Sequence, residues 1–311
     1  MPQEIEFVGV DVSKADLEVR GLGEARSRRV QNRPEGWARL IQSLPAGVVV
    51  GVEPSGGYER GLVRALLAAG VQVRWAEPAR VRALARALGT PAKTDAIDAE
   101  LIARYVCHTG GRPVKVDPDR EKLRDLLAAR SAAIDTANRL KAQAEALERG
   151  PGREVLEQLQ SAAREAAVSL TRAAMDLITA CDALEQPWRL LQTAPGVGPL
   201  VAGELLAHMP ELGSISRKPI AKLAGLAPYI RESGAWKGRA TCSGGRPRPR
   251  QLLYLAAMSA IRASPQLKAR FQGLVARGKP KMVALTACMR SLLTALNAML
   301  RDQRPWAPAY G

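Results

Sequence analysis

The sequence predicts an α/β domain followed by a mostly helical remainder, a fold class of α/β plus α. Strand and helix signals alternate over the first hundred residues, and the run Val48–Val52 is continuously apolar and β-branched, which is typical of a strand covered on both faces. From Asp119 onward strand-forming residues become rare, and Ala, Leu, Glu, Arg and Gln dominate, as they do in long helices. These changes of character predict domains over residues 1–116, 117–187 and 188–311.

The first domain is expected to open with hairpin strands and then to alternate strands with helices. Its strands are predicted at Ile5–Ser13, Leu17–Leu22, Arg28–Gln31, Val48–Val52 and Val71–Trp75. Apolar residues at helical spacing predict helices at Gly36–Leu44, Tyr58–Ala69, Arg80–Leu88 and Asp95–Tyr105.

Two long helices are predicted next, at residues 119–149 and 153–186, with Gly150-Pro151-Gly152 as the turn between them. Such helices either fold back on one another or pair between subunits as a coiled coil, and the pattern leaves both arrangements open. The last third is predicted to be mostly helical around a loop from Ala227 to Pro249. Because this loop is too long and too polar for a simple connector, we expect it to be functional or disordered.

Composition excludes several classes of protein. The chain has 311 residues, 47% of them apolar, which is enough for a core that needs no disulfide or metal. Four isolated cysteines and only two histidines argue against a disulfide framework or a zinc site, and they fit a reducing cytosol. The longest apolar stretch, Met282–Leu300, is broken by Arg290, so we expect no membrane span. The acidic N-terminus is unlike a signal peptide.

The positive charge is concentrated in the last part of the chain. The whole chain carries 46 Lys and Arg against 30 Asp and Glu, a net charge of +16. Residues 231–311 alone hold 15 of the basic and 2 of the acidic residues. This distribution is typical of a nucleic-acid-binding region, although a solvated arginine-rich surface would give the same count.

Four acidic residues form the strongest candidate for a metal site. Asp11 and Glu53 each lie at the end of a predicted strand, and Asp95 and Asp98 share one face of a predicted helix. Carboxylates from these places can converge. Carboxylates at such a short separation repel one another unless a cation lies between them. Oxygen ligands suit Mg²⁺, and paired ions of this kind stabilise phosphodiester displacement. Taken singly, each residue could equally be a turn residue or a helix cap.

A glycine-rich turn, Thr193–Pro199, lies between the predicted helices Trp188–Gln192 and Leu200–His208. Such a turn presents free backbone N–H groups to an anion, with Gly196 and Gly198 as the candidate phosphate contacts. The segment resembles the helix-hairpin-helix motif, which grips nucleic-acid backbone without reading sequence. A plain corner between two helices is the alternative.

Ser243 is the candidate nucleophile. It lies in Cys242–Arg250, before the predicted helix Gln251–Arg262, where glycines leave its hydroxyl accessible. No histidine stands beside it, so it could instead cap the helix, and Tyr229 and Tyr254 are rival nucleophiles. Basic residues are the candidate contacts to phosphate oxygens: Lys93, Lys237, Arg239, Arg246, Arg248 and Arg250.

Six sequence blocks together resemble one family. VGVDVSKADLEV, GVEPSGGYERGL and KTDAIDAELIARY look like the three acidic blocks of the DEDD-type insertion-sequence transposases. TAPGVGPLVAGELLA, KLAGLAPYIRESG and SGGRPRPRQLLYLAAMSA look like blocks of that family's C-terminal domain. The resemblance spans about residues 5–302 in the family's block order. It covers the serine-dependent, bridge-RNA-guided recombinases related to the Piv pilin-gene invertase.

The resemblance implies a RuvC-like, RNase H-fold domain at residues 1–116, a helical coiled-coil connector at 117–187, and a helical transposase domain at 188–311. By position, Asp11, Glu53, Asp95 and Asp98 match the DEDD tetrad that binds Mg²⁺, with Mn²⁺ as a substitute. Ser243 matches the serine that forms a phosphoserine link to DNA. The implied active site is composite, the tetrad of one protomer meeting the serine loop of another.

The same resemblance implies the partners and the location. These are target and donor double-stranded DNA, a bridge RNA that base-pairs with both, and a homodimer that assembles to a tetramer. The implied setting is the cytoplasm of a prokaryote, at the nucleoid. The sequence departs from the family pattern at Pro54-Ser55 after Glu53, and at Pro247 and Pro249, which we expect to delay the start of the following helix.

Several alternatives remain open at this point. A Holliday-junction resolvase would use the tetrad and water, and would not need Ser243. A DNA invertase would act without RNA. An RNase H-like sugar or acyl kinase could use Val8-Gly9-Val10-Asp11, but the basic last third and the lack of a second phosphate loop disfavour it. A decayed copy would bind nucleic acid without cutting it.

Overall fold

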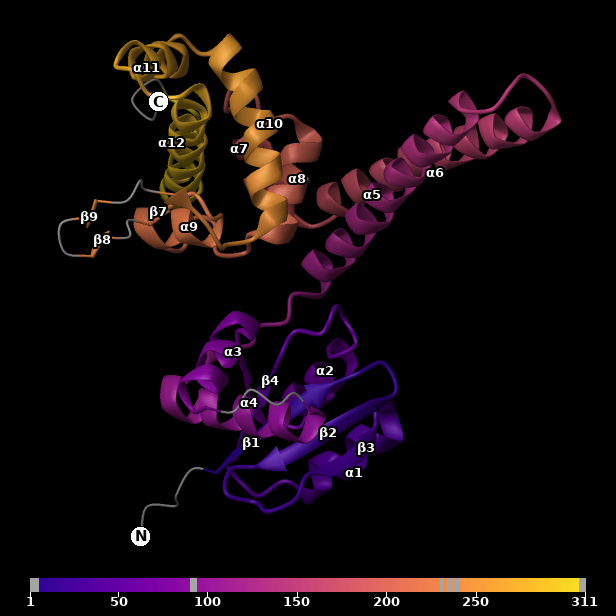
Figure 1. The fold of residues 1–311 in the computed structure, drawn as a ribbon, viewed down its shortest axis with the longest axis vertical. Coiled ribbons are helices and arrows are strands. Elements are labelled where there is room, and N and C mark those ends of the chain that lie inside the picture. The colour runs from indigo at the N-terminus through magenta and orange to yellow at the C-terminus, as the bar shows by residue number, and fades with distance from the viewer. Residues whose placement is uncertain (1–5, 90–93, 230–231, 234–235, 238–240, 308–311) are drawn as a thin grey trace. The chain divides into compact units, whose positions relative to one another are not determined.

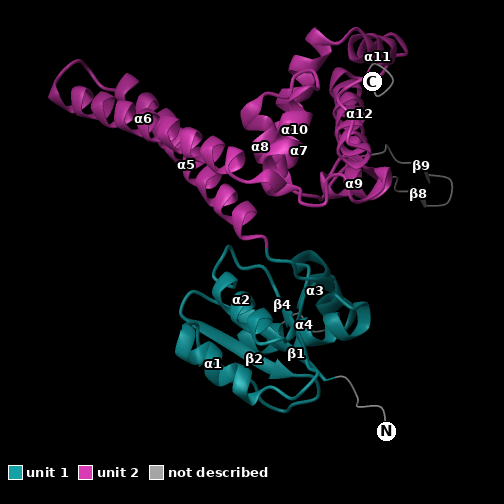
Figure 2. Cartoon of the chain, turned by 180° about the vertical axis from the view of Figure 1, so that it is seen from behind, with its two compact units in different colours: residues 1–116 teal, residues 117–311 magenta. Residues whose placement is uncertain are grey.

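The computed structural model describes residues 6–89, 94–229, 232–233, 236–237 and 241–307. The chain divides into two compact units, Met1–Val116 and Asp117–Gly311, coloured separately in Figure 2. The first unit is built on a mixed sheet and the second is mostly helical, as the sequence predicts. The further division of the second unit at residue 187 stays a prediction.

A six-stranded sheet forms the first unit, in the order β3-β2-β1-β4-β5-β6. β1, β2 and β3 are antiparallel neighbours, whereas β4 lies parallel to β1 and β5 lies parallel to β4. The buried valines of β1 and β4 belong to the core on the two faces of the sheet. The strands are β1 Phe7–Val12, β2 Asp16–Gly21, β3 Arg28–Gln31, β4 Val49–Val52, β5 Gln72–Trp75 and β6 Arg112–Pro113.

Four helices cover this sheet: α1 Pro34–Ser43, α2 Arg60–Ala68, α3 Pro78–Ala87 and α4 Asp95–Thr109. In Figure 1 helix α4 crosses the sheet over β1. Gly9 of β1 makes this close approach possible, because a Cβ there would overlap the carbonyl oxygen of Ala99. Gly51 of β4 meets Ile102 and Val106 of the same helix in the same way. Two glycines in register on neighbouring strands therefore fix where α4 lies.

The second unit begins with two long antiparallel helices, α5 Pro118–Glu145 and α6 Pro151–Thr179, which pack along their length (Figure 1). Pro151, predicted as a turn residue, is the first residue of α6, where proline needs no hydrogen-bond partner. Buried alanines such as Ala137 and Ala167 line the contact, and the Nε of Arg130 donates to the Thr171 hydroxyl at 2.8 Å.

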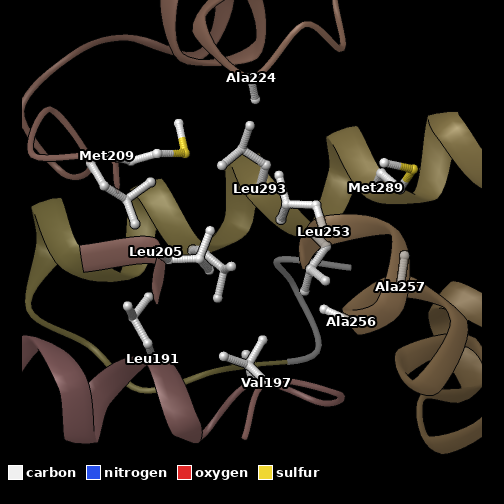
Figure 3. Packing of buried hydrophobic residues seen from close by; sticks show 14 of the residues in the cluster. Leu191, Val197, Leu205, Met209, Ala224, Leu253, Ala256, Ala257, Met289 and Leu293 are labelled. Atoms are coloured by element: carbon white, nitrogen blue, oxygen red, sulfur yellow. The ribbon is translucent and has the colours of Figure 1, made fainter. Parts of the chain in front are cut away.

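The rest of the second unit packs around one large apolar core. Its helices are α7 Asp182–Gln192, α8 Pro199–His208, α9 Arg217–Leu223, α10 Pro247–Ala263, α11 Pro265–Ala276 and α12 Lys281–Asp302. Leu191, Leu205, Leu253 and Leu293 meet from four different helices in Figure 3. Helix α12 is long and apolar enough to cross a membrane by composition alone, but most of that stretch is buried in this core.

The predicted loop after Ala227 contains short strands in its described parts. β7 Pro228–Tyr229 pairs with β10 Thr241–Cys242, and β8 Glu232–Ser233 pairs with β9 Trp236–Lys237. The expectation that prolines delay the next helix is wrong, because α10 begins at Pro247 itself. Pro247 and Pro249 both fall in the first turn, whose N–H groups have no intrahelical partner in any case.

Candidate active site and nucleic-acid contacts

Asp11 and Glu53 lie at the carboxyl ends of neighbouring parallel strands. β1 and β4 pair as far as Val10 with Val52, so Asp11 and Glu53 are the next positions in the same register. Side chains alternate between the faces of a strand, which puts Asp11 on the face of Gly9 and Glu53 on the face of Gly51. That face is the one covered by α4. Both carboxylates are half-buried.

Asp95 and Asp98 lie in the first turn of α4. The Thr94 hydroxyl caps this helix by accepting from the Ile97 N–H at 3.3 Å. Asp95 lies one turn before Ala99, and Ala99 is the residue that crosses Gly9. The acidic turn of α4 therefore lies one helical turn from the crossing over β1, the strand that leads to Asp11. Asp98 is half-buried, whereas the Asp95 side chain is 66% exposed.

Two charged residues beside this site were missed by the sequence analysis. Glu18 of β2 lies directly across from Asp11, so the two side chains share a face of the sheet. Arg29 of β3 binds Glu18 at 3.2 Å and reaches Asp95 at 3.7 Å. The hydrogen bond and charge of Glu18 raise the pKa of Arg29. The strand pairing that brings these residues together is not visible in local sequence spacing.

Glu59 organises the loop that follows Glu53. Its buried carboxylate accepts hydrogen bonds from the Ser55 N–H at 3.1 Å, the Ser55 hydroxyl at 3.0 Å and the Gly57 N–H at 2.9 Å. Asn32 ties this loop to the turn after Asp11, since its amide donates to the Ser13 carbonyl oxygen at 2.8 Å and to the Tyr58 carbonyl oxygen at 3.1 Å. These hydrogen bonds give Ser55, two residues after Glu53, a structural role in this loop.

The donor set suits a hard divalent cation. Asp11, Glu53, Asp95 and Asp98 offer only carboxylate oxygens, the ligands that Mg²⁺ and Mn²⁺ prefer. Asp11 and Glu53 lie at one end of the sheet, and Arg29 links Asp95 to Glu18, the residue across from Asp11. In the part of the chain that the structure describes, no group of three His, Cys, Asp or Glu side chains is arranged to hold a metal ion. The fit therefore rests on the donor chemistry and on the backbone positions.

Ser243 follows β10 and is exposed. The serine loop, which we define as residues 241–250, is attached by its backbone to the end of α9. Gly225, Gly244 and Gly245 all have left-handed φ values between 65° and 69°, and a Cβ on Gly245 would overlap the Gly225 N–H. The Arg246 N–H donates to the Leu223 carbonyl oxygen at 2.7 Å.

The arginines of the serine loop are bound to protein groups. Arg246 holds Glu211 through two hydrogen bonds of 2.7 and 2.6 Å and donates to the His208 carbonyl oxygen at 2.9 Å. Arg248 binds both carboxylate oxygens of Glu204, and Arg250 donates to the Gly244 carbonyl oxygen. The predicted phosphate contacts at these three arginines thus compete with internal partners and stay a prediction.

Glu204 is a fully buried carboxylate on α8. Burial alone would raise its pKa, but hydrogen bonds from His208 and Arg248 and the charge of Arg248 outweigh burial and lower it. In turn the hydrogen bond to Glu204 raises the pKa of Arg248. Glu204 is therefore a charged anchor inside the helical core, and the sequence analysis did not single it out.

The turn before α8 has a packing role at one of its two candidate glycines. Gly196 has a φ of 75°, and a Cβ there would overlap the Ala256 carbonyl oxygen of α10. Gly198 is the N-cap of α8 and has open space around it. Gly196 therefore has a packing role, and the phosphate contacts predicted at Gly196 and Gly198 stay predictions.

Some predicted residues lie beyond what the structure describes. Lys93 and Arg239 fall outside the described residues, and of Lys237 only the backbone in β9 is described. The rival nucleophiles Tyr229 and Tyr254 are both partly exposed, at 40% and 37%. Neither burial nor a contact separates them from Ser243.

Two sequence models of transposase families match the chain in order. The first, a transposase model named for the DEDD transposases of IS110, matches residues 8–147. The second, for the transposase IS116/IS110/IS902 family, matches residues 188–272. Transposase domains of the DEDD type imply an RNase H-like fold and typically use divalent metal ions, and the mixed sheet agrees with that fold. The name of the first model refers to acidic residues and not to a serine.

Curated relatives include proteins that match over most of their length. The pilin gene-inverting protein of Moraxella bovis is 27% identical over 96% of this chain and 97% of its own. The pilin gene-inverting protein of Moraxella lacunata is 27% identical over 82% of this chain and 80% of its own. An uncharacterized 42 kDa protein of insertion element IS900 from Mycobacterium paratuberculosis is 35% identical over 39% of this chain and 31% of its own. The two family models and these relatives agree, and the chain belongs to the IS110/IS116 family of transposases, enzymes that cleave and rejoin DNA.

Proposed function

We propose that this chain is the transposase, or site-specific recombinase, of an insertion sequence, and that it exchanges DNA strands through a covalent phosphoserine at Ser243. The observation that carries the proposal is the serine loop. It presents an exposed hydroxyl on a backbone held by left-handed glycines and by hydrogen bonds to α8 and α9. Rigid presentation of a nucleophile is what a covalent transfer needs.

The proposed step is phosphoryl transfer. The Ser243 Oγ attacks a phosphorus of the DNA backbone, forming a P–O bond to serine while the bond from phosphorus to the 3′ oxygen breaks. The serine proton passes to a general base and the departing 3′ oxygen takes up a proton. A free 3′ hydroxyl of the exchange partner then attacks the phosphoserine, which restores a phosphodiester and returns the serine hydroxyl.

Asp11, Glu53, Asp95 and Asp98 are the proposed metal ligands. Support for this assignment comes from the neighbouring strand ends that carry the first two and from the first turn of α4, which carries the others and packs over β1. When bound, Mg²⁺ would neutralise charge on the phosphate and make the transfer easier. Glu18 and Arg29 would set the charge balance beside these carboxylates, and Glu59 would hold the loop that follows Glu53.

Covalent trapping tests the serine step. The protein is expressed with its native flanking DNA, denatured, and examined for DNA that stays attached, alongside the variants Ser243→Ala and Asp11→Ala. We expect an alkali-labile adduct with the natural sequence and none with either variant. Cleavage that survives Ser243→Ala and leaves no adduct would reject the serine step and favour a resolvase that uses water.

A structured RNA from the element's non-coding end is the second part of the proposal, with base pairing to target and donor DNA giving specificity. Similarity to pilin gene-inverting proteins over most of their length favours a competing function, DNA inversion. We propose that such an invertase would act without RNA. Sequencing the RNA that copurifies with the protein, followed by strand exchange with and without ribonuclease, separates the two. Exchange that persists after ribonuclease treatment would favour the invertase.

A further inference from the structure

The serine loop has two carboxylates as its anchors, and both come from one stretch of chain. Glu204 lies on α8, and Glu211 follows that helix by three residues. Arg246 binds Glu211 and Arg248 binds Glu204, across about 35 and 44 residues of sequence. Together these four residues join the base of the serine loop to the C-terminal end of α8.

We propose that Arg246 and Arg248 are positioning residues that hold Ser243 in place by clamping the serine loop to Glu211 and Glu204, and that they are not ligands of the DNA phosphates. This inference rests on the proposed serine step, because positioning matters only if Ser243 reacts. It also assigns a role to two acidic residues that the phosphate assignment leaves without one.

The geometry of Arg246 supports a clamp. Its two hydrogen bonds to Glu211 are the bidentate pairing that fixes a guanidinium in direction as well as distance. A third bond goes to the carbonyl oxygen of His208, the last residue of α8, where a helix has unpaired oxygens and favours positive charge. Both terminal nitrogens of Arg246, which a phosphate contact would need, therefore already donate to protein oxygens.

The environment of Arg248 supports the same conclusion. Its partner Glu204 has no exposed surface and also lies 3.4 Å from the Nε2 of His208. Turning Arg248 toward DNA would leave a carboxylate buried without its main counter-charge, which is strongly unfavourable. Arg250 adds a third bond within the loop, to the carbonyl oxygen of Gly244 beside Ser243.

A double-mutant cycle on Arg246 and Glu211 tests the proposal. The variants are Arg246→Ala, Glu211→Gln and the double variant, with Arg262→Ala as a control on the exposed face of α10. Glu204 is avoided as a primary target because its burial makes unfolding a risk. The readouts are the cleavage rate at saturating DNA, the DNA concentration at half-saturation, its salt dependence, and hydrogen exchange of the peptide that contains the serine loop.

A clamp predicts the same change in all three variants. The rate at saturating DNA falls by about 100-fold, since a displacement of about 1 Å in a reacting group has this effect. The double variant is no slower than either single variant. Half-saturation and its salt dependence stay unchanged, and the loop peptide exchanges faster. The control variant changes neither rate nor exchange.

A phosphate ligand predicts a different pattern, which would overturn the proposal. Arg246→Ala would then weaken DNA binding and lower the salt slope by about 1, and Glu211→Gln would do neither. Unchanged hydrogen exchange in both variants would also overturn it. If Ser243→Ala still cleaves DNA, the serine step is wrong, and hydrogen exchange still decides whether the clamp exists. Arg246→Lys, which keeps the charge but not the bidentate pairing, should recover only part of the rate.

Discussion

At the scale of single residues, Glu204 shows how a buried charge is kept. The carboxylate lies in the core of the helical unit, where an unpaired charge would be very costly. Arg248 from α10 and His208 one turn along α8 both donate to it. The charge is thus held by one local and one distant partner. Loss of the Glu204 charge should therefore weaken both the contact between α8 and α10 and the attachment of the serine loop.

The pH dependence of stability follows from the lowered pKa of Glu204. Because the folded protein holds this pKa below its ordinary value of 4.5, the stabilisation is complete above that pH and is lost as the pH falls through the folded-state pKa. Glu204→Gln should therefore lower the free energy of unfolding by about 2 kcal/mol at neutral pH and by less in acid. Urea unfolding monitored at neutral and acidic pH measures both values. An equal loss at the two pH values would mean that the charge of Glu204 contributes nothing.

At the scale of elements, the placement of α4 depends on two glycines. A methyl group on Gly9 would overlap backbone atoms of α4, and one on Gly51 would press on Ile102 and Val106. Backbone cannot move aside as a flexible side chain can. The position of the first turn of α4, with Asp95 and Asp98, therefore depends on the close approach of the helix to the strands, which the two glycines allow.

Gly9→Ala should shift α4 away from β1. We expect the free energy of unfolding to fall by about 1–3 kcal/mol, the usual cost of overpacking, and cleavage to fall much further because the carboxylates separate. Gly273→Ala is the matched control, since Gly273 lies within α11 with open space around it and alanine favours a helix. Equal effects of the two substitutions on cleavage would show that α4 does not position the tetrad.

The end of α8 is also held by the long helix α5. Arg120 donates to the Leu206 carbonyl oxygen at 2.7 Å, and Arg124 donates to the Ala207 carbonyl oxygen at 3.0 Å. With Arg246 on His208, three arginines bind three successive carbonyl oxygens at this helix end. The long helix pair and the serine loop therefore meet at the same few atoms of α8.

Removing one of these bonds should loosen the contact between α5 and α8. Arg120→Ala is expected to lower the free energy of unfolding by about 1–3 kcal/mol, because the Leu206 carbonyl oxygen loses a charged donor. Lys122→Ala is the control on the same helix, since its side chain is 67% exposed and its pair with Asp119 should contribute under about 0.5 kcal/mol. Thermal or urea unfolding compares the two. A similar loss for both variants would mean that the bond to the Leu206 carbonyl oxygen is not its cause.

The elements were easier to predict from sequence than the contacts between them. Apolar periodicity predicted the strands around Val10, Val50 and Val73 and the mostly helical character of the second unit, because these patterns are local. The single helix predicted at 153–186 is wrong, since α6 ends at Thr179 and a separate helix, α7, begins at Asp182. The prediction that Pro247 and Pro249 delay the helix after Ser243 is wrong, since proline in a first helical turn is favourable. Arg246 and Arg248 were assigned to phosphate because their carboxylate partners lie about 35 and 44 residues away, where no spacing rule reaches.

At the scale of the whole molecule, helix α6 carries exposed apolar residues on more than one face. Helix α6 leaves Val155, Leu159 and Val168 more than half exposed along its length. Arg164, Glu165 and Arg172 surround Val168 with charges of both signs. Val155 and Leu159 lie one turn apart on one face, whereas Val168 lies about 180° around the helix from Leu159. A single contact with a second copy of the chain would therefore leave part of this apolar surface exposed, so the oligomeric state has to be tested by experiment.

Mixing two inactive variants tests whether the proposed active site is shared between protomers. Asp11→Asn removes a carboxylate from the tetrad, and Ser243→Ala removes the proposed nucleophile, so each variant alone should not cleave. If the tetrad of one protomer acts with the serine loop of another, a mixed assembly contains one site with both parts intact, and cleavage returns on mixing. The control replaces one partner with a chain that carries both substitutions, which should restore nothing. If each protomer used its own tetrad and serine, every site in the mixture would lack one part, and persistent inactivity of mixed oligomers, verified with two affinity tags, would reject the shared site.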